Sequence, residues 1–353
     1  MSEENLKKRT IKGFGWNFLD NILNRGISFF VGIVLARLLS PSEYGLIGII
    51  MIFIAIFNSI VDSGLGSALI RKNDCTEEDY DTVFHSNLFL SIIMSLLFFL
   101  CAPLIADFFN EPQLKPLAQV MSCTLIINAL SIIQNTLLLK QLDFKGKMVI
   151  SMISSLASGA AGIAMAYSGY GVWSLVGQQI SRQVLYTTLL WLHNRWIPRL
   201  RFSKSSFHEL FGFGWKLLVS GLIDTVWKEI YQVVIGKFYT PATLGLYSRA
   251  HQFSTIFSSN LTSVVQSVSF PALSKVQDDP AKLKRGFRKV NKTSMLISFA
   301  MMFGMMAVAE PMVKVLIGDK WLPCVPFLQI ICLQMVLYPL HSQNLNLLEI
   351  RGR

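Results

Sequence analysis

Gly13-Phe14-Gly15-Trp16 returns later in the chain as Gly212-Phe213-Gly214-Trp215, and each copy opens a long apolar segment. A second matching pair follows the copies: Ser40-Pro41-Ser42-Glu43-Tyr44-Gly45-Leu46 after the first and Thr240-Pro241-Ala242-Thr243-Leu244-Gly245-Leu246 after the second. Matching motifs in the same order predict an internal duplication. Duplicated bundles of membrane helices are typical of transporters, so the sequence predicts a protein that moves a molecule across a bilayer.

The composition predicts an all-α polytopic membrane protein. Hydrophobic residues make up 52% of the 353 residues and charged residues 15%, against roughly 25% charged residues in ordinary soluble domains. The mean hydropathy is +0.48. A membrane helix needs about 20 mostly apolar residues. Ten segments meet that length, at 14–38, 44–70, 83–109, 117–139, 148–167, 172–192, 211–238, 244–273, 294–317 and 327–348.

Basic residues alternate between the connections of these segments, which sets the expected orientation. They gather at 7–12, 71–72, 140–147, 195–204, 275–292 and 351–353, whereas the intervening connections carry few. This positive-inside pattern predicts a multi-pass protein of the cytoplasmic (inner) membrane with both chain ends in the cytoplasm. It also accounts for the net charge of +11 without a nucleic-acid partner. The first segment lacks a signal-peptide cleavage site, so we expect it to remain as a helix.

The duplication divides the chain into two expected repeats. Residues 1–205 hold six helices, and residues 206–353 hold four. Because six is an even number, both repeats begin on the same side of the membrane and are parallel rather than inverted. The second repeat is two helices short of the first, so we expect it to be incomplete at its C-terminal end.

Polar residues recur along the first and seventh segments at helical spacing. Superposing the two Gly-Phe-Gly-Trp motifs places Arg25 opposite Asp224. We therefore expect the two polar stripes to face a shared central cavity, with Arg25 and Asp224 approaching each other in one conformation. Residues near the helix ends, such as Asn17 and Lys216, have the alternative of reaching the membrane interface. The stripes comprise Asn17, Asn21, Asn24, Arg25 and Ser28 on the first segment and Lys216, Ser220, Asp224 and Lys228 on the seventh.

Intramembrane charges are costly and commonly mark transport pathways, so these residues define the expected site. The predicted substrate-binding cations are Arg25, Arg182, Lys216, Lys228 and Arg249; the predicted polar lining is Asn21, Asn24, Asn58 and Gln252; the carboxylates for ion coupling are Asp62, Asp224 and Glu229. Each carboxylate has the alternative role of a fixed counter-ion. Any single amide or hydroxyl has the alternative role of a hydrogen bond between helices.

The expected cargo follows from the cationic and polar side chains. Guanidinium groups bind phosphate, while amides and hydroxyls replace water around sugar hydroxyls. A lipid-linked sugar pyrophosphate has both parts, and its head group does not cross hydrocarbon unaided. Catalytic signals are absent from the sequence: it contains no phosphate loop, no metal-ligand spacing and no nucleophile beside a base. The sequence therefore predicts a transporter without cofactor or metal, rather than an enzyme.

Four motifs resemble those of bacterial polysaccharide exporters of the Wzx type. They are Leu38-Leu39-Ser40-Pro41-Ser42-Glu43-Tyr44-Gly45, Asp62-Ser63-Gly64-Leu65-Gly66-Ser67-Ala68-Leu69-Ile70, Gly169-Tyr170-Gly171-Val172-Trp173-Ser174-Leu175 and Asn344-Leu345-Asn346. The resemblance implies membership of the multidrug/oligosaccharidyl-lipid/polysaccharide superfamily and a fold like that of its multidrug members. Since proteins of this family usually have at least twelve helices, the chain departs from it by ending after ten.

The resemblance also implies an activity and partners. The implied activity is flipping of an undecaprenyl-pyrophosphate-linked oligosaccharide to the periplasmic leaflet, by alternating access, for lipopolysaccharide or capsule biosynthesis. The implied partners are this lipid-linked oligosaccharide, membrane lipids, a polysaccharide polymerase and a chain-length regulator. Three alternatives stay open: a multidrug cation antiporter on the same fold, a membrane glycosyltransferase or polymerase, and a nonfunctional truncated transporter.

Overall fold

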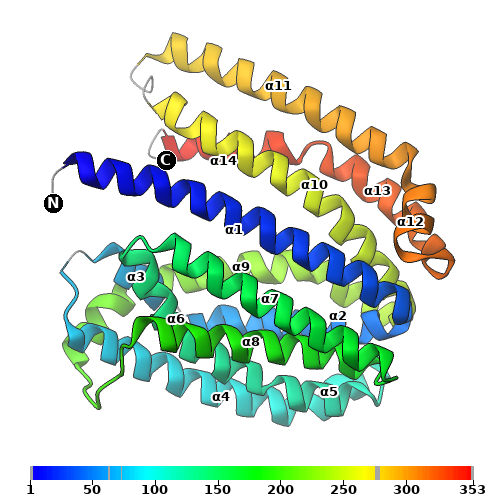
Figure 1. Ribbon diagram of the computed structural model, residues 1–353, viewed down its shortest axis with the longest axis horizontal. Coiled ribbons are helices and arrows are strands. Elements are labelled where there is room, and N and C mark those ends of the chain that lie inside the picture. Colours follow the sequence, from blue (N-terminus) through cyan, green and yellow to red (C-terminus); the bar gives the residue numbers. More distant parts are fainter. Residues whose placement is uncertain (1–2, 63, 73, 275–278, 351–353) are drawn as a thin grey trace. The chain divides into compact units, whose positions relative to one another are not determined.

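The computed structural model describes residues 3–62, 64–72, 74–274 and 279–350, and every element among them is helical (Figure 1). This agrees with the all-α class expected from the sequence. The helices are α1 (Glu3–Leu38), α2 (Pro41–Asp62), α3 (Leu65–Arg71), α4 (Glu77–Phe109), α5 (Leu114–Met121), α6 (Cys123–Lys140), α7 (Phe144–Tyr167), α8 (Val172–Asn194), α9 (Lys204–Phe238), α10 (Pro241–Ser274), α11 (Pro280–Ala307), α12 (Ala309–Ile317), the 3-10 helix η1 (Asp319–Cys324), α13 (Val325–Met335) and α14 (Tyr338–Ile350).

Seven helical stretches within these residues are long and apolar enough to cross a membrane, or eight if a bent pair counts as one span. The bent pair joins α11 to α12 at an angle of 67°. All ten apolar segments expected from the sequence lie on helices, but α8 and α10 are not among the seven because their polar side chains lower their hydropathy. The total of ten spans therefore stays a prediction.

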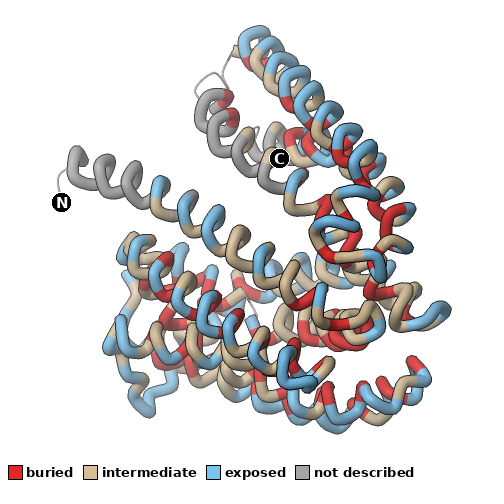
Figure 2. The backbone as a smooth tube through the Cα atoms, turned by 45° about the vertical axis from the view of Figure 1, so that its right-hand side comes forward, coloured by how far each residue is buried: buried red, intermediate tan, exposed pale blue. Residues whose placement is uncertain are grey.

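The chain divides into two compact units, Met1–Leu244 and Gly245–Arg353. In the first unit, α7 packs against both α1 and α8, and α9 packs against α2, α3 and α4. Buried residues alternate with exposed ones along the helices, as expected where each helix turns one face to its neighbours (Figure 2). The predicted division into repeats 1–205 and 206–353 rests on matching sequence motifs, whereas the two compact units are defined by contacts. The division into repeats therefore stays a prediction.

The second pair of repeated motifs forms helix starts of the same kind. Before α2, the backbone N–H of Ser40 donates to Glu43 Oε2 at 2.6 Å, and Glu43 N–H donates to Ser40 Oγ at 3.4 Å. Before α10, Thr243 N–H donates to Thr240 Oγ1 at 3.3 Å. Side chains of this type satisfy the backbone donors that a helix start leaves open. The repeated residues thus serve to begin α2 and α10.

Glycine is required in the first of these motifs. A Cβ atom at Gly45 would lie 1.7 Å from the carbonyl oxygen of Pro241, so only a residue without a side chain allows this approach of α2 to the start of α10. Gly64 is a second such position: its φ is +68°, and a Cβ there would lie 2.5 Å from the carbonyl oxygen of Gly214 on α9. The bend at Gly64 ends α2 and lets α3 begin.

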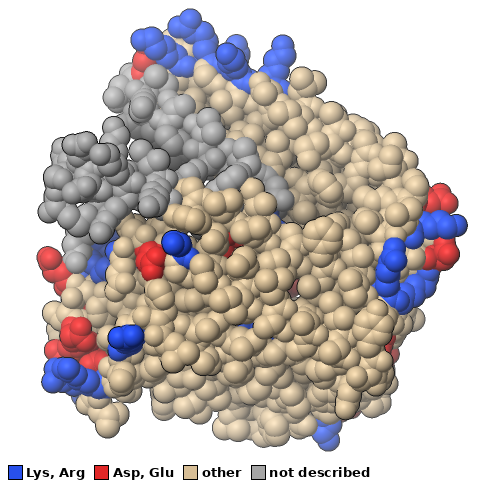
Figure 3. All heavy atoms as spheres, in the orientation of Figure 1, with Lys and Arg blue, Asp and Glu red and all other residues tan. Residues whose placement is uncertain are grey.

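In the second unit, the N-terminal half of α11 carries a dense row of Lys and Arg side chains (Figure 3). Asp279 begins this helix by accepting hydrogen bonds from the backbone N–H groups of Ala281 and Lys282, at 3.1 and 3.0 Å. These bonds hold the pKa of Asp279 below its ordinary value. The helix then continues into an apolar half.

Some residues that the sequence analysis used lie outside the described part of the chain, wholly or in their side chains. They are Asn17, Ser63, Leu345, Asn346 and the ranges 7–14, 275–278 and 351–353.

Candidate functional site: a polar cavity in the first unit

A cavity of about 590 Å³ lies within the first unit. Its walls come from α2, α3, α6, α8 and α9, and most of the side chains on them are amides, hydroxyls or carboxylates. We call it the polar cavity. Its polar walls are Asn58, Ser59 and Asp62 of α2, Ser67 of α3, Asn128, Ser131, Asn135 and Thr136 of α6, Tyr186 of α8, and Asp224 and Thr225 of α9.

Amide groups link three helices around this cavity. Gln183 Nε2 donates to Asn128 Oδ1 at 3.2 Å, and Asn128 Nδ2 donates in turn to Asn58 Oδ1 at 2.9 Å. The hydroxyl of Tyr186 donates to Asn135 Oδ1 at 3.3 Å. Asn128 and Asn135 are seven residues apart on α6, a spacing that places both on one helix face. The amides therefore hold one another in fixed orientations beside the open space.

The charged groups on the cavity walls are carboxylates. Asp62 ends α2, and Asp224 lies on α9, where it pairs with Lys228 one turn along, with Nζ 2.5 Å from Oδ2. Both members of that pair are exposed, at 59% for Asp224 and 66% for Lys228. Of the five predicted cations, none is on the walls of the polar cavity. The cavity as formed is polar and acidic.

A second group of polar residues lies where α1, α7 and α8 meet. Asn24 donates to the carboxylate of Asp20, and Ser155 Oγ donates to Asn24 Oδ1 at 2.8 Å. The cations of Lys147 and Arg182 act electrostatically on Asp20. Tyr186 connects this group to the polar cavity, because it lines the cavity and also interacts with Asp20 and Arg182.

The remaining predicted residues of the first unit lie away from the polar cavity. Arg25 is half-buried on α1, and Asn21 is exposed there. Lys216 is exposed on α9, and Glu229 accepts a hydrogen bond from Gln232 Nε2 at 2.5 Å. The approach of Arg25 to Asp224 concerns another conformation and stays a prediction.

Two predicted residues belong to the second unit. Arg249 is buried, with 6% exposure; it donates to Gln252 Oε1 at 2.6 Å, and its guanidinium carbon lies 5.8 Å from the ring centre of Trp321. Trp321 is fully buried, so Arg249 packs within the unit. Gln252 is exposed.

Sequence reasoning missed several wall residues. Asn128, Asn135 and Tyr186 stood in segments that appeared as ordinary apolar helices, and the signal was the seven-residue spacing of the two amides. Asp20 was passed over although it lies one residue from Asn21 in the polar stripe of α1. Which of these side chains converge depends on how α6, α8 and α1 pack, and a hydropathy pattern does not contain that information.

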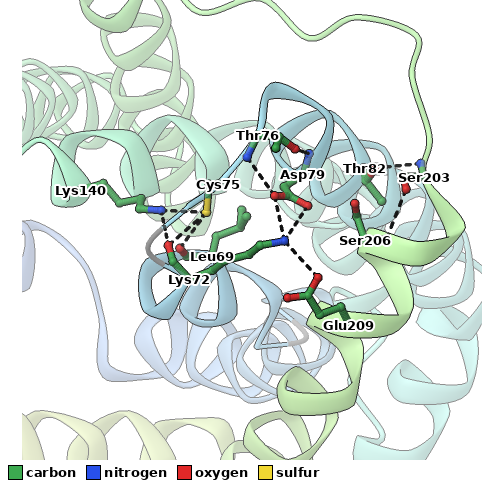
Figure 4. Close-up of polar contacts among 10 residues, drawn as sticks. All are labelled: Leu69, Lys72, Cys75, Thr76, Asp79, Thr82, Lys140, Ser203, Ser206 and Glu209. Carbon is green, nitrogen blue, oxygen red and sulfur yellow. Dashed lines mark hydrogen bonds and ion pairs between the residues drawn. The ribbon is translucent and has the colours of Figure 1, made fainter.

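Ion pairs fasten one end of the first unit, where α3, α4, α6 and α9 meet (Figure 4). Lys72 Nζ lies 3.1 Å from Asp79 Oδ2 and 3.1 Å from Glu209 Oε2. Lys140 Nζ donates to the carbonyl of Lys72 and contacts Cys75 Sγ, both at 2.8 Å. We call these five residues the Lys72 network. It connects the ends of helices from both predicted repeats.

The two carboxylates determine the charge state of Lys72. Partial burial lowers the pKa of Lys72, but its hydrogen bonds to Glu209 and Asp79 outweigh burial and raise the pKa above its ordinary value. Asp79 is held in turn by the start of α4, since Thr76 N–H donates to Asp79 Oδ2 at 2.9 Å. The connection before α9 is fixed nearby, because Ser203 N–H donates to Thr82 Oγ1 at 3.0 Å.

Known proteins resemble this chain along most of its length. It is 27% identical to the succinoglycan biosynthesis transport protein ExoT of Rhizobium meliloti (strain 1021), over 92% of this chain and 66% of ExoT. It is 28% identical to the teichuronic acid biosynthesis protein TuaB of Bacillus subtilis (strain 168), over 83% of this chain and 61% of TuaB. The lipopolysaccharide biosynthesis protein WzxC of Escherichia coli (strain K12) is 25% identical, over 99% of this chain and 71% of WzxC. The chain thus spans about two thirds of the length of these relatives.

Solved structures show the same fold. The lipid II flippase MurJ in an inward closed conformation matches with a TM-score of 0.75 and 15% identity, over 94% of this chain and 75% of MurJ. An inward-facing multidrug resistance transporter of the MATE family matches with a TM-score of 0.67 and 16% identity, over 92% of this chain and 80% of that one. The expected fold, like that of the multidrug members of the superfamily, is thereby confirmed.

The family of the chain follows from the length of the sequence match. A family profile described as "Polysaccharide biosynthesis protein" matches residues 34–326, from the end of α1 into α13. Among these similar proteins, ExoT is described as a transport protein, MurJ as a flippase and the MATE protein as a transporter, in agreement with the expected transporter. This multi-pass membrane protein therefore belongs to the polysaccharide biosynthesis protein family.

Proposed function

We propose that the chain moves a lipid-linked saccharide across the cytoplasmic membrane during polysaccharide biosynthesis. The observation that carries this proposal is the polar cavity, which presents fixed amides and hydroxyls inside a bundle of membrane helices. Such groups replace water around sugar hydroxyls, whereas an apolar cargo gains nothing from them. The family and the fold of a lipid II flippase agree with such a cargo.

The finer parts of the proposal concern the cargo and the membrane. We propose an oligosaccharide linked to undecaprenyl pyrophosphate as the cargo, with a polysaccharide polymerase and a chain-length regulator as partners. Ten spans in two parallel repeats, at 1–205 and 206–353, with both chain ends in the cytoplasm, complete the proposed architecture. The alternation of basic connections supports this orientation.

Cations are proposed to bind the pyrophosphate. Arg182 is the best placed of the predicted set, because both it and the cavity-lining Tyr186 interact with Asp20. Arg25, Lys216, Lys228 and Arg249 are proposed to contact the pyrophosphate in other conformations of the transport cycle. Lys228 becomes available only when its pair with Asp224 opens.

Carboxylates are proposed to couple transport to an ion gradient. Asp62 is the first candidate, since it is exposed and lines the polar cavity. Asp224 has its counter-ion in Lys228, and Glu229 is bonded to Gln232. Asp62→Asn is expected to abolish the dependence of transport on the ion gradient while leaving the protein folded.

The test of the proposal measures translocation in lipid vesicles. The probe is a fluorescent saccharide joined through pyrophosphate to an isoprenoid chain, and a membrane-impermeant quencher reports which leaflet holds it. The Asn58→Leu/Asn135→Leu double variant removes two of the amides that would bind sugar, and a loss of about 0.5–1.5 kcal/mol for each bond predicts roughly tenfold slower translocation. Gln179→Leu, at an exposed site on α8, is the matched control. Equal translocation with and without protein would refute the proposal.

Export of cationic drugs is a second candidate, favoured by the two carboxylates on the cavity walls and by the fold of a MATE transporter. A cationic dye loaded into the same vesicles distinguishes the two. If this candidate is right, the dye leaves the vesicles faster with protein than without, and Asp62→Asn stops its exit. If the protein carries saccharides instead, the dye leaves no faster with protein than without, and Asp62→Asn does not change the rate of dye exit.

A further inference from the structure

A second cavity in the first unit is apolar. It has a volume of about 480 Å³ and lies between α4 and the connection into α9, with Leu65 of α3 on its wall. Its apolar walls include Phe89 and Leu90 of α4 and Phe202, Phe207 and Phe211 around the start of α9. We call it the phenylalanine groove. Its volume falls in the range of roughly 300–1,000 Å³ of small-molecule sites.

Two of the three polar residues on the groove wall direct their side chains to backbone carbonyls of their own helix, α4. The Ser86 hydroxyl donates to the carbonyl of Thr82 at 2.7 Å, and His85 Nδ1 lies 2.7 Å from the carbonyl of Asp81. Asn87, the third polar residue, is buried. The ring planes of Phe207 and Phe211 stack at 11° with centres 5.3 Å apart. The wall therefore presents aromatic faces and hydrocarbon to a ligand.

The depth of the groove determines which molecules reach it. α4 is one of the candidate spans, and Ser86 lies three residues after residue 83, where the apolar segment of α4 begins. At 1.5 Å per residue this is about 5 Å along the helix, so the groove opens at the edge of a hydrocarbon layer of about 30 Å. Phe89 is 68% exposed and Phe202 54%. Molecules arriving from that layer are lipid chains.

The groove and the polar cavity share their dividing wall. Leu65 lines the groove and the next residue, Gly66, lines the polar cavity. α9 is divided in the same way: Phe207 and Phe211 face the groove, while Asp224 lines the cavity. Between them, a Cβ atom at Gly64 would lie 2.5 Å from the carbonyl oxygen of Gly214, so the start of α3 and α9 pack closely at this point of the wall.

We propose that the phenylalanine groove binds the hydrocarbon chain of the lipid carrier while its saccharide head occupies the polar cavity. This inference rests on the proposed function, because it assigns the apolar part of the same substrate. An amphiphile needs an apolar site beside a polar one, and the two cavities with their common α3 and α9 wall meet that need. The hydrocarbon chain of the carrier stays on the membrane-facing side of the wall, and only the head group crosses between leaflets inside the protein.

Photo-crosslinking in phosphatidylcholine vesicles tests the assignment. The probe is an isoprenyl pyrophosphate saccharide with a diazirine in its isoprenoid chain, and mass spectrometry locates the adducts. We expect adducts at residues 85–90 and 202–211. Leu90→Trp, which fills the groove, lowers them at least fivefold. Ile93→Trp, the same change at a 42% exposed site on α4 outside the groove, leaves them unchanged.

A phosphatidylglycerol with a diazirine in its acyl chain separates the carrier from bulk lipid. The proposal expects this probe to label the groove less than the isoprenoid probe, and equal labelling would overturn it. Phe211→Ala is a second variant that keeps the test valid if Leu90→Trp fails to fold. It removes part of the groove wall, so we expect it to lower the isoprenoid adducts. If the wild-type protein translocates the probe but Leu90→Trp leaves the adducts unchanged, the groove assignment is refuted and the proposed function is not. Groove adducts without any translocation refute the proposed function alone.

Discussion

At the scale of single residues, the amides around the polar cavity decide both packing and chemistry. Asn128 is central because it accepts from Gln183 of α8 and donates to Asn58 of α2. Hydrogen bonds between membrane helices contribute on average about 0.6 kcal/mol, and at most about 1.7 kcal/mol. Asn128 therefore joins three helices at a modest energy per bond while keeping its partners oriented toward the cavity.

Replacing Asn128 by leucine is expected to destabilise the protein by about 1–2 kcal/mol, because both hydrogen bonds are lost and Asn58 keeps an unsatisfied carbonyl. Thermal unfolding in detergent micelles measures the loss. Gln179→Leu, on the exposed side of α8, is the control and should unfold at the wild-type temperature. Equal unfolding temperatures for Asn128→Leu and wild type would show that the amide chain contributes nothing.

Asp143 gives a prediction that depends on pH. It starts α7 by accepting from Gly146 N–H at 2.9 Å and contacts His193 Nε2 at 2.8 Å. Partial burial raises the pKa of Asp143, but the Gly146 and His193 hydrogen bonds outweigh it and lower the pKa below the ordinary 3.8. A lowered carboxyl pKa stabilises the fold above pH 3.8, and this stabilisation is lost as the pH falls through the lowered value.

Asp143→Ala is therefore expected to cost about 0.5–2 kcal/mol at neutral pH, and Asp143→Asn less, because asparagine also caps helices. Unfolding temperatures of both variants and wild type between pH 7 and pH 3 check this expectation. The gap between Asp143→Ala and wild type should narrow toward the acid end. A gap of constant size would mean that the carboxylate charge plays no part.

At the scale of helices, the sequence predicted the presence of the helices better than the positions of the breaks between them. Each apolar segment became helical because a membrane leaves the backbone few other ways to satisfy its hydrogen bonds. Residues 44–70 were expected as one segment, yet the φ of +68° at Gly64 divides them into α2 and α3. The residues of the polar cavity were predicted only in part, because Asn58, Asp62 and Asp224 stand out as polar while Asn128 gains its role from packing.

The close approach of α2 and the start of α10 can be tested with alanine. Gly45→Ala would place a Cβ atom 1.7 Å from the backbone of Pro241, which no side-chain movement relieves. We expect the helices to separate, with a loss of several kcal/mol, of the size of other severe core changes. Gly212→Ala, with no atom within 4 Å of the added Cβ, should be neutral or slightly stabilising. Chemical denaturation of the two variants in micelles distinguishes these outcomes.

At the scale of the molecule, the Lys72 network holds together helix ends that the proposed transport cycle would move. Its two ion pairs differ in burial, since the Asp79 side chain is 1% exposed and that of Glu209 is 62% exposed. Exposed ion pairs contribute about 0–1 kcal/mol, and hydrogen bonds to charged groups in buried places about 1.5–3 kcal/mol. The Lys72–Asp79 contact is therefore expected to stabilise the fold more than the Lys72–Glu209 contact.

Double-mutant cycles are expected to reproduce this difference. The coupling of Lys72 to Asp79 should exceed 1 kcal/mol, whereas that of Lys72 to Glu209 should stay below about 1 kcal/mol and weaken in high salt. Because the pKa of Lys72 is raised from 10.5, both couplings persist at neutral pH and are lost on the alkaline side as the pH rises through the raised value. Couplings of equal size would contradict the burial argument.

Cys75 makes this end of the protein observable. Its sulfur contacts Lys140 Nζ at 2.8 Å and lies 3.3 Å from the carbonyls of Leu69 and Lys72, and the residue is partly buried, so we expect a maleimide to react faster when α6 and the end of α3 part. Cys324 and Cys332 are buried in the second unit, and replacing the other four cysteines by alanine leaves a single reactive thiol. The alkylation rate of Cys75 then times each opening of the molecule, with and without cargo, using a reporter already present in the natural chain.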